Sequence, residues 1–326
     1  MAVILVTGGA GYIGSHTCKA LAAMGHEPVV YDNLTRGHAD AVKWGPLIQG
    51  DIRDYDSIHN ALIKHRPEAV LHFAAYAYVG ESVSSPGKYY RNNVAGAITT
   101  LNAMQAAAVN KFVFSSTCST YGTPETNPIG DGHPQNPINP YGRSKLMVEQ
   151  ILRDFATAFG LRSCALRYFN AAGADPDTEI GERHDPEPHL IPNVLLTALG
   201  RREKVTVHGD DYDTPDGTCI RDYIHVMDLA DAHILALDVL ERRDGFQFYN
   251  LGNEVGYSVL EIIAQAREIC DRDIPVETGP RRAGDPAVLV ADSERAREAL
   301  GWVPKLAALE DIIGTAWQWY RRANVA

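Results

Sequence analysis

The sequence is poor in cysteine and in long apolar runs. Only five of its 326 residues are cysteines, and no two form a C-x-x-C pair, so neither a zinc–cysteine site nor a disulfide framework is indicated. The apolar run at residues 3–6 is stopped by Gly8 and lacks the charged start of a signal peptide. No segment approaches the ~20 apolar residues of a membrane span. We therefore expect a cytoplasmic protein with reduced thiols and no membrane partner.

Net positive charge is also missing. Lysine and arginine total 30 against 41 aspartate and glutamate residues, which gives a net charge of −11. An acidic protein repels nucleic acid and anionic membranes, although one basic pocket can still bind a phosphate. The expected partner is a small molecule.

What the sequence does contain is an alternation of strand and helix patterns. Short apolar runs lie at residues 3–7, 28–31, 69–73 and 111–115, and helical patterns lie at 14–24 and 94–108. This order is typical of βαβ units, so we predict an α/β fold with a Rossmann-type, doubly wound parallel sheet. Ligands of such sheets bind at the carboxyl ends of the strands.

The pattern changes after residue 170. Polar stretches at 174–189 and 209–217 predict long loops, and helical patterns follow at 260–270 and 309–321. We predict a cofactor-binding domain at residues 1–170 and a smaller, substrate-binding α/β domain at 171–326, some segments of which return to the first. His184 and His189 in the first loop suggest a metal, but a solvated loop without one is our prediction.

A glycine-rich loop separates the first strand from the first helix. Its three spaced glycines have separate roles: Gly8 permits the turn, Gly11 lets backbone N–H groups approach a pyrophosphate, and Gly14 allows helix and strand to pack closely. The helix N-terminus adds partial positive charge. The flanking strand and helix supply the context that a dinucleotide-binding motif requires.

Asp32 ends the second strand and sets the expected cofactor. A carboxylate there accepts hydrogen bonds from the adenosine ribose and repels the 2′-phosphate of NADP, so NAD is predicted. Arg36 lies nearby and could weaken that preference. Asp51, after the third strand signal, could reach the adenine.

A tyrosine and a lysine lie one helical turn apart in the sequence NPYGRSK. Asn139 and Pro140 suit the start of a helix, which puts Tyr141 and Lys145 on one face. A phenol with a pKa near 10 is a poor base at neutral pH, but a nearby ammonium and an oxidised nicotinamide would lower its pKa. The phenolate could then deprotonate an alcohol that loses a hydride, with Thr117 bonded to the reacting oxygen.

Together these motifs resemble the extended short-chain dehydrogenase/reductases, and within them the UDP-glucose 4-epimerase family. The resemblance runs from residue 3 to about residue 319. It is most specific in TGGAGYIGSHT at 7–17, VGES at 79–82, YGRSKLMVEQ at 141–150, RYFN at 167–170, RDYIHVMD at 221–228 and YNLG at 249–252.

The resemblance implies a redox-neutral isomerase that interconverts UDP-glucose and UDP-galactose. Tyr141 would remove the 4-OH proton while the C4 hydride passes to a permanently bound NAD. The 4-keto sugar would turn over and take the hydride back on its other face. Lys145 would also hold the nicotinamide ribose. A homodimer is expected by the same resemblance.

The resemblance also implies two sets of binding residues. The cofactor set is Gly8, Gly11, Tyr12, Ile13, Gly14, Asp32, Asn33, Asp51, Ile52, Phe73, Ala74, Ala75, Asn92, Tyr141, Lys145 and Phe169. The set for UDP and sugar is Thr117, Asn170, His189, His208, Arg221, Arg282, Asp285 and Leu289. Arg221 and Arg282 suit a diphosphate in their own right, because guanidinium groups pair bidentately with phosphate.

Three positions depart from some relatives. Thr117 replaces serine and keeps the hydroxyl, whereas Ala77 removes a lysine near the cofactor phosphates. Leu289 replaces a tyrosine beside the sugar, so an N-acetyl group could fit. Epimerisation of UDP-GlcNAc and UDP-GalNAc, or of another UDP-sugar, therefore remains open.

Three other functions compete with this interpretation. A 4,6-dehydratase needs acidic groups beside Thr117, but Cys118 and Ser119 stand there. A simple NAD(P)-dependent reductase would have to release its cofactor at each turnover. A non-catalytic dinucleotide sensor would have no use for Tyr141 and Lys145.

Overall fold

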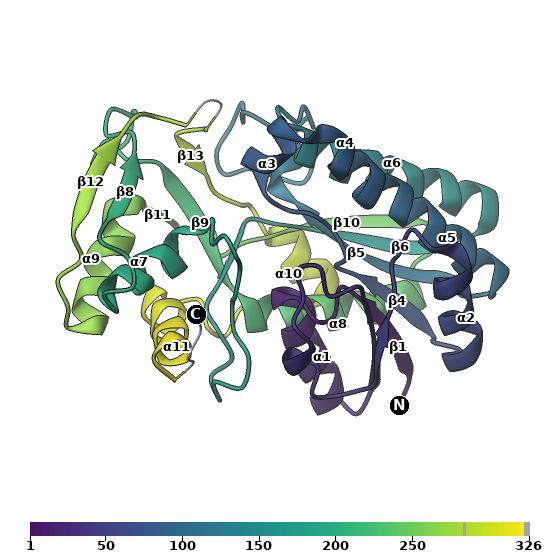
Figure 1. Cartoon of the computed structure of the whole chain (residues 1–326). Helices are drawn as coiled ribbons and strands as arrows, with labels where there is room; N and C mark the ends of the chain where they lie inside the picture. Colours follow the sequence, from purple (N-terminus) through teal and green to yellow (C-terminus); the bar gives the residue numbers. More distant parts are fainter. Residues whose placement is uncertain (283–284, 323–326) are drawn as a thin grey trace.

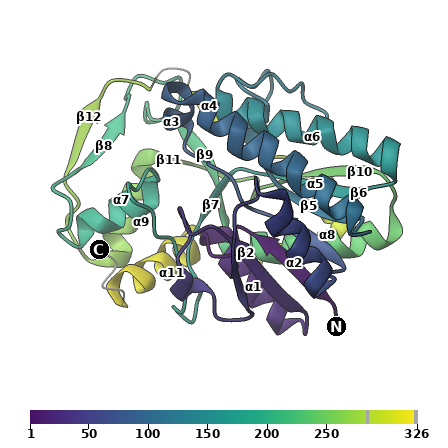
Figure 2. The same cartoon turned by 45° about the vertical axis from the view of Figure 1, so that its right-hand side comes forward.

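The computed structural model describes residues 1–282 and 285–322. Figure 1 shows a large layered lobe around a long sheet and a smaller lobe that contains α7, α9, α11, β8 and β12. The turned view in Figure 2 separates the two lobes and shows α5 and α6 lying over the sheet. No helix of the described ranges is long and apolar enough to cross a bilayer.

The large sheet has seven strands, all of them parallel, in the order β10-β6-β5-β4-β1-β2-β3. The predicted doubly wound parallel sheet is confirmed. Strand β10 comes from the second half of the chain but pairs with β6 at the sheet edge. The strands are β1 (Val3–Thr7), β2 (Glu27–Asp32), β3 (Leu47–Gln49), β4 (Ala69–His72), β5 (Lys111–Thr117), β6 (Arg162–Tyr168) and β10 (Phe246–Leu251).

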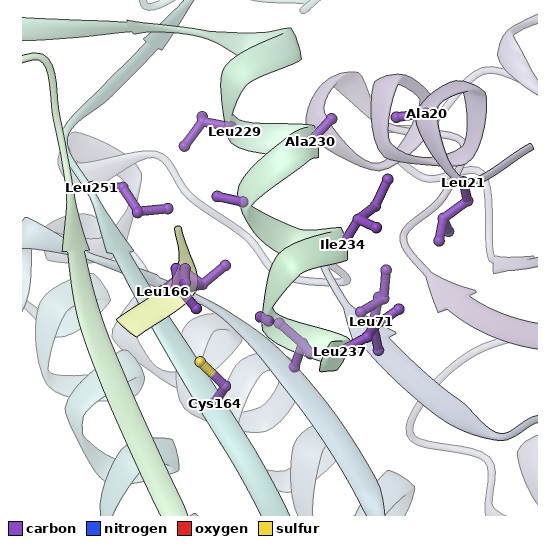
Figure 3. Packing of buried hydrophobic residues seen from close by; sticks show 14 of the residues in the cluster. Ala20, Leu21, Leu71, Cys164, Leu166, Leu229, Ala230, Ile234, Leu237 and Leu251 are labelled. Atoms are coloured by element: carbon purple, nitrogen blue, oxygen red, sulfur yellow. The ribbon is translucent and has the colours of Figure 1, made fainter. Parts of the chain in front are cut away.

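Both faces of this sheet are apolar because helices cover both. Ile4 and Val6 of β1 belong to the core under α1 and α8, whereas Leu5 belongs to the core under α2, α5 and α6. In Figure 3, Ile234 and Leu237 of α8 lie between the sheet and α1. The helices are α1 (Tyr12–Ala23), α8 (Val226–Arg242), α2 (Tyr55–His65), α5 (Gly96–Ala106) and α6 (Pro140–Phe159).

Two helix predictions need correction. The first helix begins at Tyr12, two residues before the predicted start, because Gly11 serves as its N-cap. The helix expected at 94–108 is split: residues Tyr90–Ala95 form a π-helical segment, η2, and α5 follows. Such segments cannot be deduced from apolar periodicity, because the extra residue per turn is imposed by tertiary contacts.

The smaller lobe has its own core and two small sheets. Strands β7, β9, β11 and β13 form one sheet, and β8 pairs with β12 in the other. Helices α7, α9 and α11 share an apolar core with β8 and β9. These elements are β7 (Asn170–Ala172), β8 (Val205–His208), β9 (Ile220–His225), β11 (Gly256–Ser258), β12 (Val276–Gly279), β13 (Val288–Leu289), α7 (Leu190–Ala198), α9 (Val259–Cys270) and α11 (Leu309–Arg322).

Short elements complete the fold, and the two polar loops predicted at 174–189 and 209–217 are confirmed. The short elements are α3 (Val79–Ser84), α4 (Pro86–Tyr89), α10 (Glu294–Leu300) and the single turns η1 (Ala39–Ala41) and η3 (Cys118–Thr120).

A buried ion pair joins α6 to the sheet. Glu149 and Arg167 are 0% and 1% exposed, and the guanidinium donates to both carboxylate oxygens at 3.0 and 2.6 Å. Ser116 donates to the same carboxylate at 2.6 Å, and Arg167 also donates to the Tyr121 hydroxyl at 2.9 Å. The pair therefore fixes α6 against β5 and β6.

Changing Glu149 to Gln should destabilise the protein strongly. The change leaves the Arg167 charge buried without its counter-ion, for which we expect a loss of about 3–5 kcal/mol in the free energy of unfolding. The midpoint of urea denaturation measures this. Glu277→Gln is the control, because its partner Lys204 lies on the surface. Equal midpoints for the two variants would contradict the role of the buried pair.

Candidate active site

The glycine loop between β1 and α1 is too tightly packed for side chains. A Cβ on Gly14 would lie 2.3 Å from the Gly8 carbonyl oxygen, and one on Gly8 would lie 2.5 Å from the Ala74 nitrogen. Gly8 also has φ +74°, which L side chains rarely adopt. The loop thus presents bare backbone at the N-terminus of α1, as a pyrophosphate requires.

Asp32 is positioned by the same loop. One carboxylate oxygen accepts from the Ala10 N–H at 3.1 Å, and the other accepts from the Leu34 N–H at 2.8 Å. Burial raises the pKa of Asp32, and these two donors oppose the rise. Each oxygen keeps a lone pair for a ribose hydroxyl, so the glycine loop and Asp32 fit NAD.

The neighbouring cofactor residues also meet here. Asn33 donates to Asp51 at 3.1 Å, and Asp51 is held by Arg53, which keeps the pKa of that carboxyl below its usual range. Arg36 donates to the Asp185 carbonyl at 2.5 Å, so its guanidinium is already engaged by the loop of the other lobe. Residues 73–75 follow β4 beside Gly8, whereas Ile52 lies in the core against α5.

The predicted catalytic residues lie together at the carboxyl end of β5. Asn139 caps α6 by accepting from the Gly142 N–H at 2.8 Å, as predicted. The Thr117 side chain, at the end of β5, is close enough to the Tyr141 phenol to influence its pKa, and the Lys145 ammonium lies 5.9 Å from the Tyr141 ring centroid. Lys145 is 2% exposed and donates to the Ser115 carbonyl at 2.7 Å.

The electrostatics of the pair differ from the expectation. Burial raises the pKa of Tyr141 to about 12, with Thr117 opposing the rise. Burial lowers the pKa of Lys145 to about 7, with Glu149 opposing the fall. The lowered phenol pKa was predicted for Lys145 together with an oxidised nicotinamide; among the protein groups alone, burial dominates the pKa of Tyr141, and the joint effect stays a prediction.

Asn93 is a residue that sequence reasoning missed. Asn92, which the resemblance places at the cofactor, donates to the Asn93 side-chain oxygen Oδ1 at 3.0 Å. Asn93 in turn donates to the Ser144 hydroxyl at 3.1 Å and pairs with the backbone of Tyr76. It therefore connects the segment after β4 to the helix that carries Lys145. The sequence did offer one signal for Asn93, because two adjacent asparagines stand out in an otherwise apolar helical pattern.

Several residues predicted to hold the substrate gather around Arg221. Its guanidinium donates to Asp285 at 2.5 Å, and Asn170 donates to the next backbone carbonyl, that of Asp222, at 2.9 Å. Burial lowers the pKa of His208, and the nearby charge of Arg282 adds to this effect. The arrangement concentrates two guanidinium groups, which suits a diphosphate.

Leu289 connects this basic group to the catalytic residues. Strand β13 places it beside Arg221 of β9, and its side chain packs against the apolar cluster that includes Cys118 and Phe169. Cys118 follows Thr117 directly, and burial raises its thiol pKa to about 12. The site between Thr117 and Arg221 therefore has an apolar wall.

His189 lies in a different group of side chains. Its ring nitrogen Nδ1 lies 2.5 Å from a Glu182 oxygen and 3.2 Å from a Glu187 oxygen, with His184 beside them. Burial alone would raise the pKa of Glu182, but His189 and His184 lower it to about 2. The prediction of a solvated loop is wrong here, because the Glu182 and Glu187 side chains are buried.

Comparison with known proteins agrees with a site for NAD and a diphosphate. The model of the NAD dependent epimerase/dehydratase family matches residues 4–252. A UDP-glucose 4-epimerase from Rhizobium leguminosarum bv. trifolii is 53% identical over 98% of both chains.

Two solved structures have the same fold over nearly the whole chain. The UDP-glucose 4-epimerase from Brucella ovis in complex with NAD is 53% identical, with a TM-score of 0.95 over 98% of both chains. The enzyme from Stenotrophomonas maltophila, with bound NAD and formylated UDP-arabinopyranose, is 42% identical, with a TM-score of 0.95 over 99% of this chain and 98% of that one. The chain therefore belongs to the NAD dependent epimerase/dehydratase family.

Proposed function

We propose that the protein interconverts UDP-glucose and UDP-galactose with NAD as its resident cofactor. The observation that carries the proposal is the placement of Tyr141, Thr117 and Lys145 between the cofactor loop and the basic group around Arg221. A fold that binds NAD only as a sensor has no need of Tyr141 and Lys145 there. The relatives of nearly equal length bear this enzyme name.

Each catalytic residue has a role that follows from its contacts. NAD, when bound, supplies an acceptor for the C4 hydride and a positive charge next to the phenol. Tyr141 takes the 4-OH proton and later returns it. Thr117, whose side chain opposes the rise in the phenol pKa, would hydrogen-bond to the reacting oxygen. Lys145 is held by the Ser115 carbonyl at 2.7 Å and would bind the nicotinamide ribose.

The substrate must be held by its nucleotide while its sugar turns over. We assign the diphosphate to Arg221 and Arg282, with Asp285 orienting Arg221 at 2.5 Å. Asn170 begins β7, which pairs with the strand of Arg221, and His208 ends β8 in the neighbouring two-stranded sheet. We leave His189 out of this set, since Glu182 and Glu187 already engage it.

We also propose a cytoplasmic homodimer, with residues 1–170 mainly binding NAD and residues 171–326 mainly binding the UDP-sugar. The five cysteines are all unpaired, which suits a reducing compartment. Val83 on α3 and Met147 on α6 are 64% and 40% exposed, and these helices pack together. That apolar face is our candidate for the contact between two copies.

A second substrate pair, UDP-GlcNAc and UDP-GalNAc, is favoured by one observation. Leu289 forms the apolar wall beside Cys118 and Phe169, where a tyrosine would occupy more of the site. The shorter side chain leaves room for an N-acetyl group, so we propose activity on both sugar types.

The first prediction of this assignment is that purified protein converts UDP-galactose to UDP-glucose without added NAD. The tightly held cofactor gives back each hydride, so no net reduction should occur. The ratio of the two sugar nucleotides is measured by anion-exchange chromatography. A requirement for added NAD(P)H, with a reduced product, would show a reductase instead.

Changing Tyr141 to Phe should lower kcat by at least about 10²-fold, because it removes the only proton acceptor that we assign. Bound NAD, measured after release by acid, should stay at the wild-type level. Tyr249→Phe is the matched control, since this buried hydroxyl has no hydrogen-bond partner in residues 1–282 and 285–322. Activity of the Tyr141 variant equal to that of the control would disprove the assignment.

Changing Leu289 to Tyr should reduce turnover of UDP-GlcNAc far more than turnover of UDP-glucose. A loss of about 10-fold or more in the ratio of the two kcat/KM values corresponds to removal of space for an acetyl group. The UDP-glucose rate of the same variant is the internal control. An unchanged ratio would mean that Leu289 does not set the size of the sugar site.

A further inference from the structure

Four side chains of the loop before α7 converge on one point. Glu182, His184, Glu187 and His189 each offer one ligand atom, and these atoms all lie within 4.8 Å of one another. Two imidazole nitrogens and two carboxylate oxygens form a donor set that zinc and other divalent transition metals bind. The proposed reaction uses none of these four residues.

Three of the four separations between these ligand atoms lie within or just below the edge lengths of a coordination polyhedron. His184 Nδ1 lies 3.1 Å from Glu182 Oε1 and 3.5 Å from Glu187 Oε2, and His189 Nδ1 lies 3.2 Å from Glu187 Oε1. Ligand atoms held about 2.0–2.2 Å from a tetrahedral zinc ion are about 3.3–3.6 Å apart. The remaining separation, 2.5 Å between His189 Nδ1 and Glu182 Oε1, is shorter than such an edge.

The hydrogen bonds do not account for this arrangement. Glu182 is 3% exposed, yet its Oε1 atom has no partner with hydrogen-bond geometry among residues 1–282 and 285–322. His184 Nδ1 has none either. The His184 and His189 Nδ1 atoms approach the same Glu182 oxygen at 3.1 and 2.5 Å, as ion pairs that lack full hydrogen-bond geometry. Buried polar atoms usually have partners with good geometry, which a shared metal ion would supply here.

The surrounding backbone holds the four side chains in place. Trp319 and Tyr320 of α11 both donate to the Glu182 carbonyl at 3.1 Å. Arg36 donates to the Asp185 carbonyl from the other lobe. The rings of Tyr12 and Tyr78 meet the His184 ring edge-on, at centroid distances of 6.4 and 5.9 Å. The loop is thus preorganised by contacts from both lobes.

We propose that Glu182, His184, Glu187 and His189 bind one divalent transition metal ion, zinc by preference, as a structural site. The four protein ligands close the coordination sphere, so the ion does not activate a water. Both imidazoles bind as neutral rings, so a bound proton leaves wherever a ring was charged. Through His184, whose ring contacts Tyr12, the ion ties the loop to the start of α1. Through His189 it ties the loop to the start of α7.

A second acidic group on the same loop already has a cation of the protein, the Lys19 ammonium, at its centre. Asp175, Asp177 and Glu179 also converge, but the Lys19 ammonium lies 2.8, 2.7 and 2.8 Å from their oxygens. A cation of the protein itself occupies that position. The contrast makes Glu179→Gln a matched control, because it removes a carboxylate from the same loop outside the proposed site.

The test measures metal in the full-length protein with its cofactor bound. After dialysis with zinc and removal of excess, mass spectrometry should find about one zinc per chain in the wild type and in Glu179→Gln. Glu182→Gln and His184→Ala should retain less than about a tenth of that amount. If either variant does not fold, His189→Asn replaces it, because that side chain is half exposed.

Two further measurements separate a built site from surface binding. Cobalt in place of zinc should give the visible absorption of a tetrahedral ion in the wild type but not in Glu182→Gln. Equimolar zinc should raise the Tm of the wild type and leave that of Glu182→Gln unchanged. Absence of stoichiometric zinc, or equal losses in Glu179→Gln and Glu182→Gln, would overturn the proposal and leave an ion-pair cluster. Neither result depends on which sugar the enzyme uses.

Discussion

The active site is organised by the buried ammonium group of Lys145, which α6 packs against the sheet. Lys145 lies against the Phe114 ring at 4.8 Å and donates to the Ser115 carbonyl, which fixes α6 on the end of β5. Residues 141, 145 and 149 follow one another at four-residue spacing, so Tyr141, Lys145 and Glu149 share a helix face. Glu149 is in turn locked by Arg167. A shift of this face would move the phenol away from Thr117.

Because of the same burial, Tyr141 can act as a base only when oxidised NAD is bound. Desolvation holds the pKa of Tyr141 near 12 and that of Lys145 near 7, so the protein alone favours a neutral phenol. The missing positive charge belongs to oxidised NAD, which the glycine loop and Asp32 fit. Proton removal is thereby restricted to chains that carry the cofactor in its oxidised form, which suits an enzyme that must not release a half-reacted sugar.

Local patterns predicted the parts of the site that depend on short-range geometry. The glycine spacing, Asp32 at a strand end, the cap at Asn139 and the Tyr141–Lys145 face all follow from neighbours in sequence. The π-helical segment with Asn93, the Arg221–Asp285 pair and the burial of Glu182 depend on contacts between distant segments, which periodicity does not encode. The dominance of burial in the pKa of Tyr141 among the protein groups was missed for the same reason.

The central claim is that cofactor charge, and not Lys145 alone, makes Tyr141 a base. The most direct measurement is an ultraviolet titration of phenolate formation, taken as the difference between the wild type and Tyr141→Phe. The account predicts a step near neutral pH with NAD bound and a shift to about 12 once NAD is removed. A step above pH 10 in the NAD-bound protein, or the same pKa in both states, would contradict it.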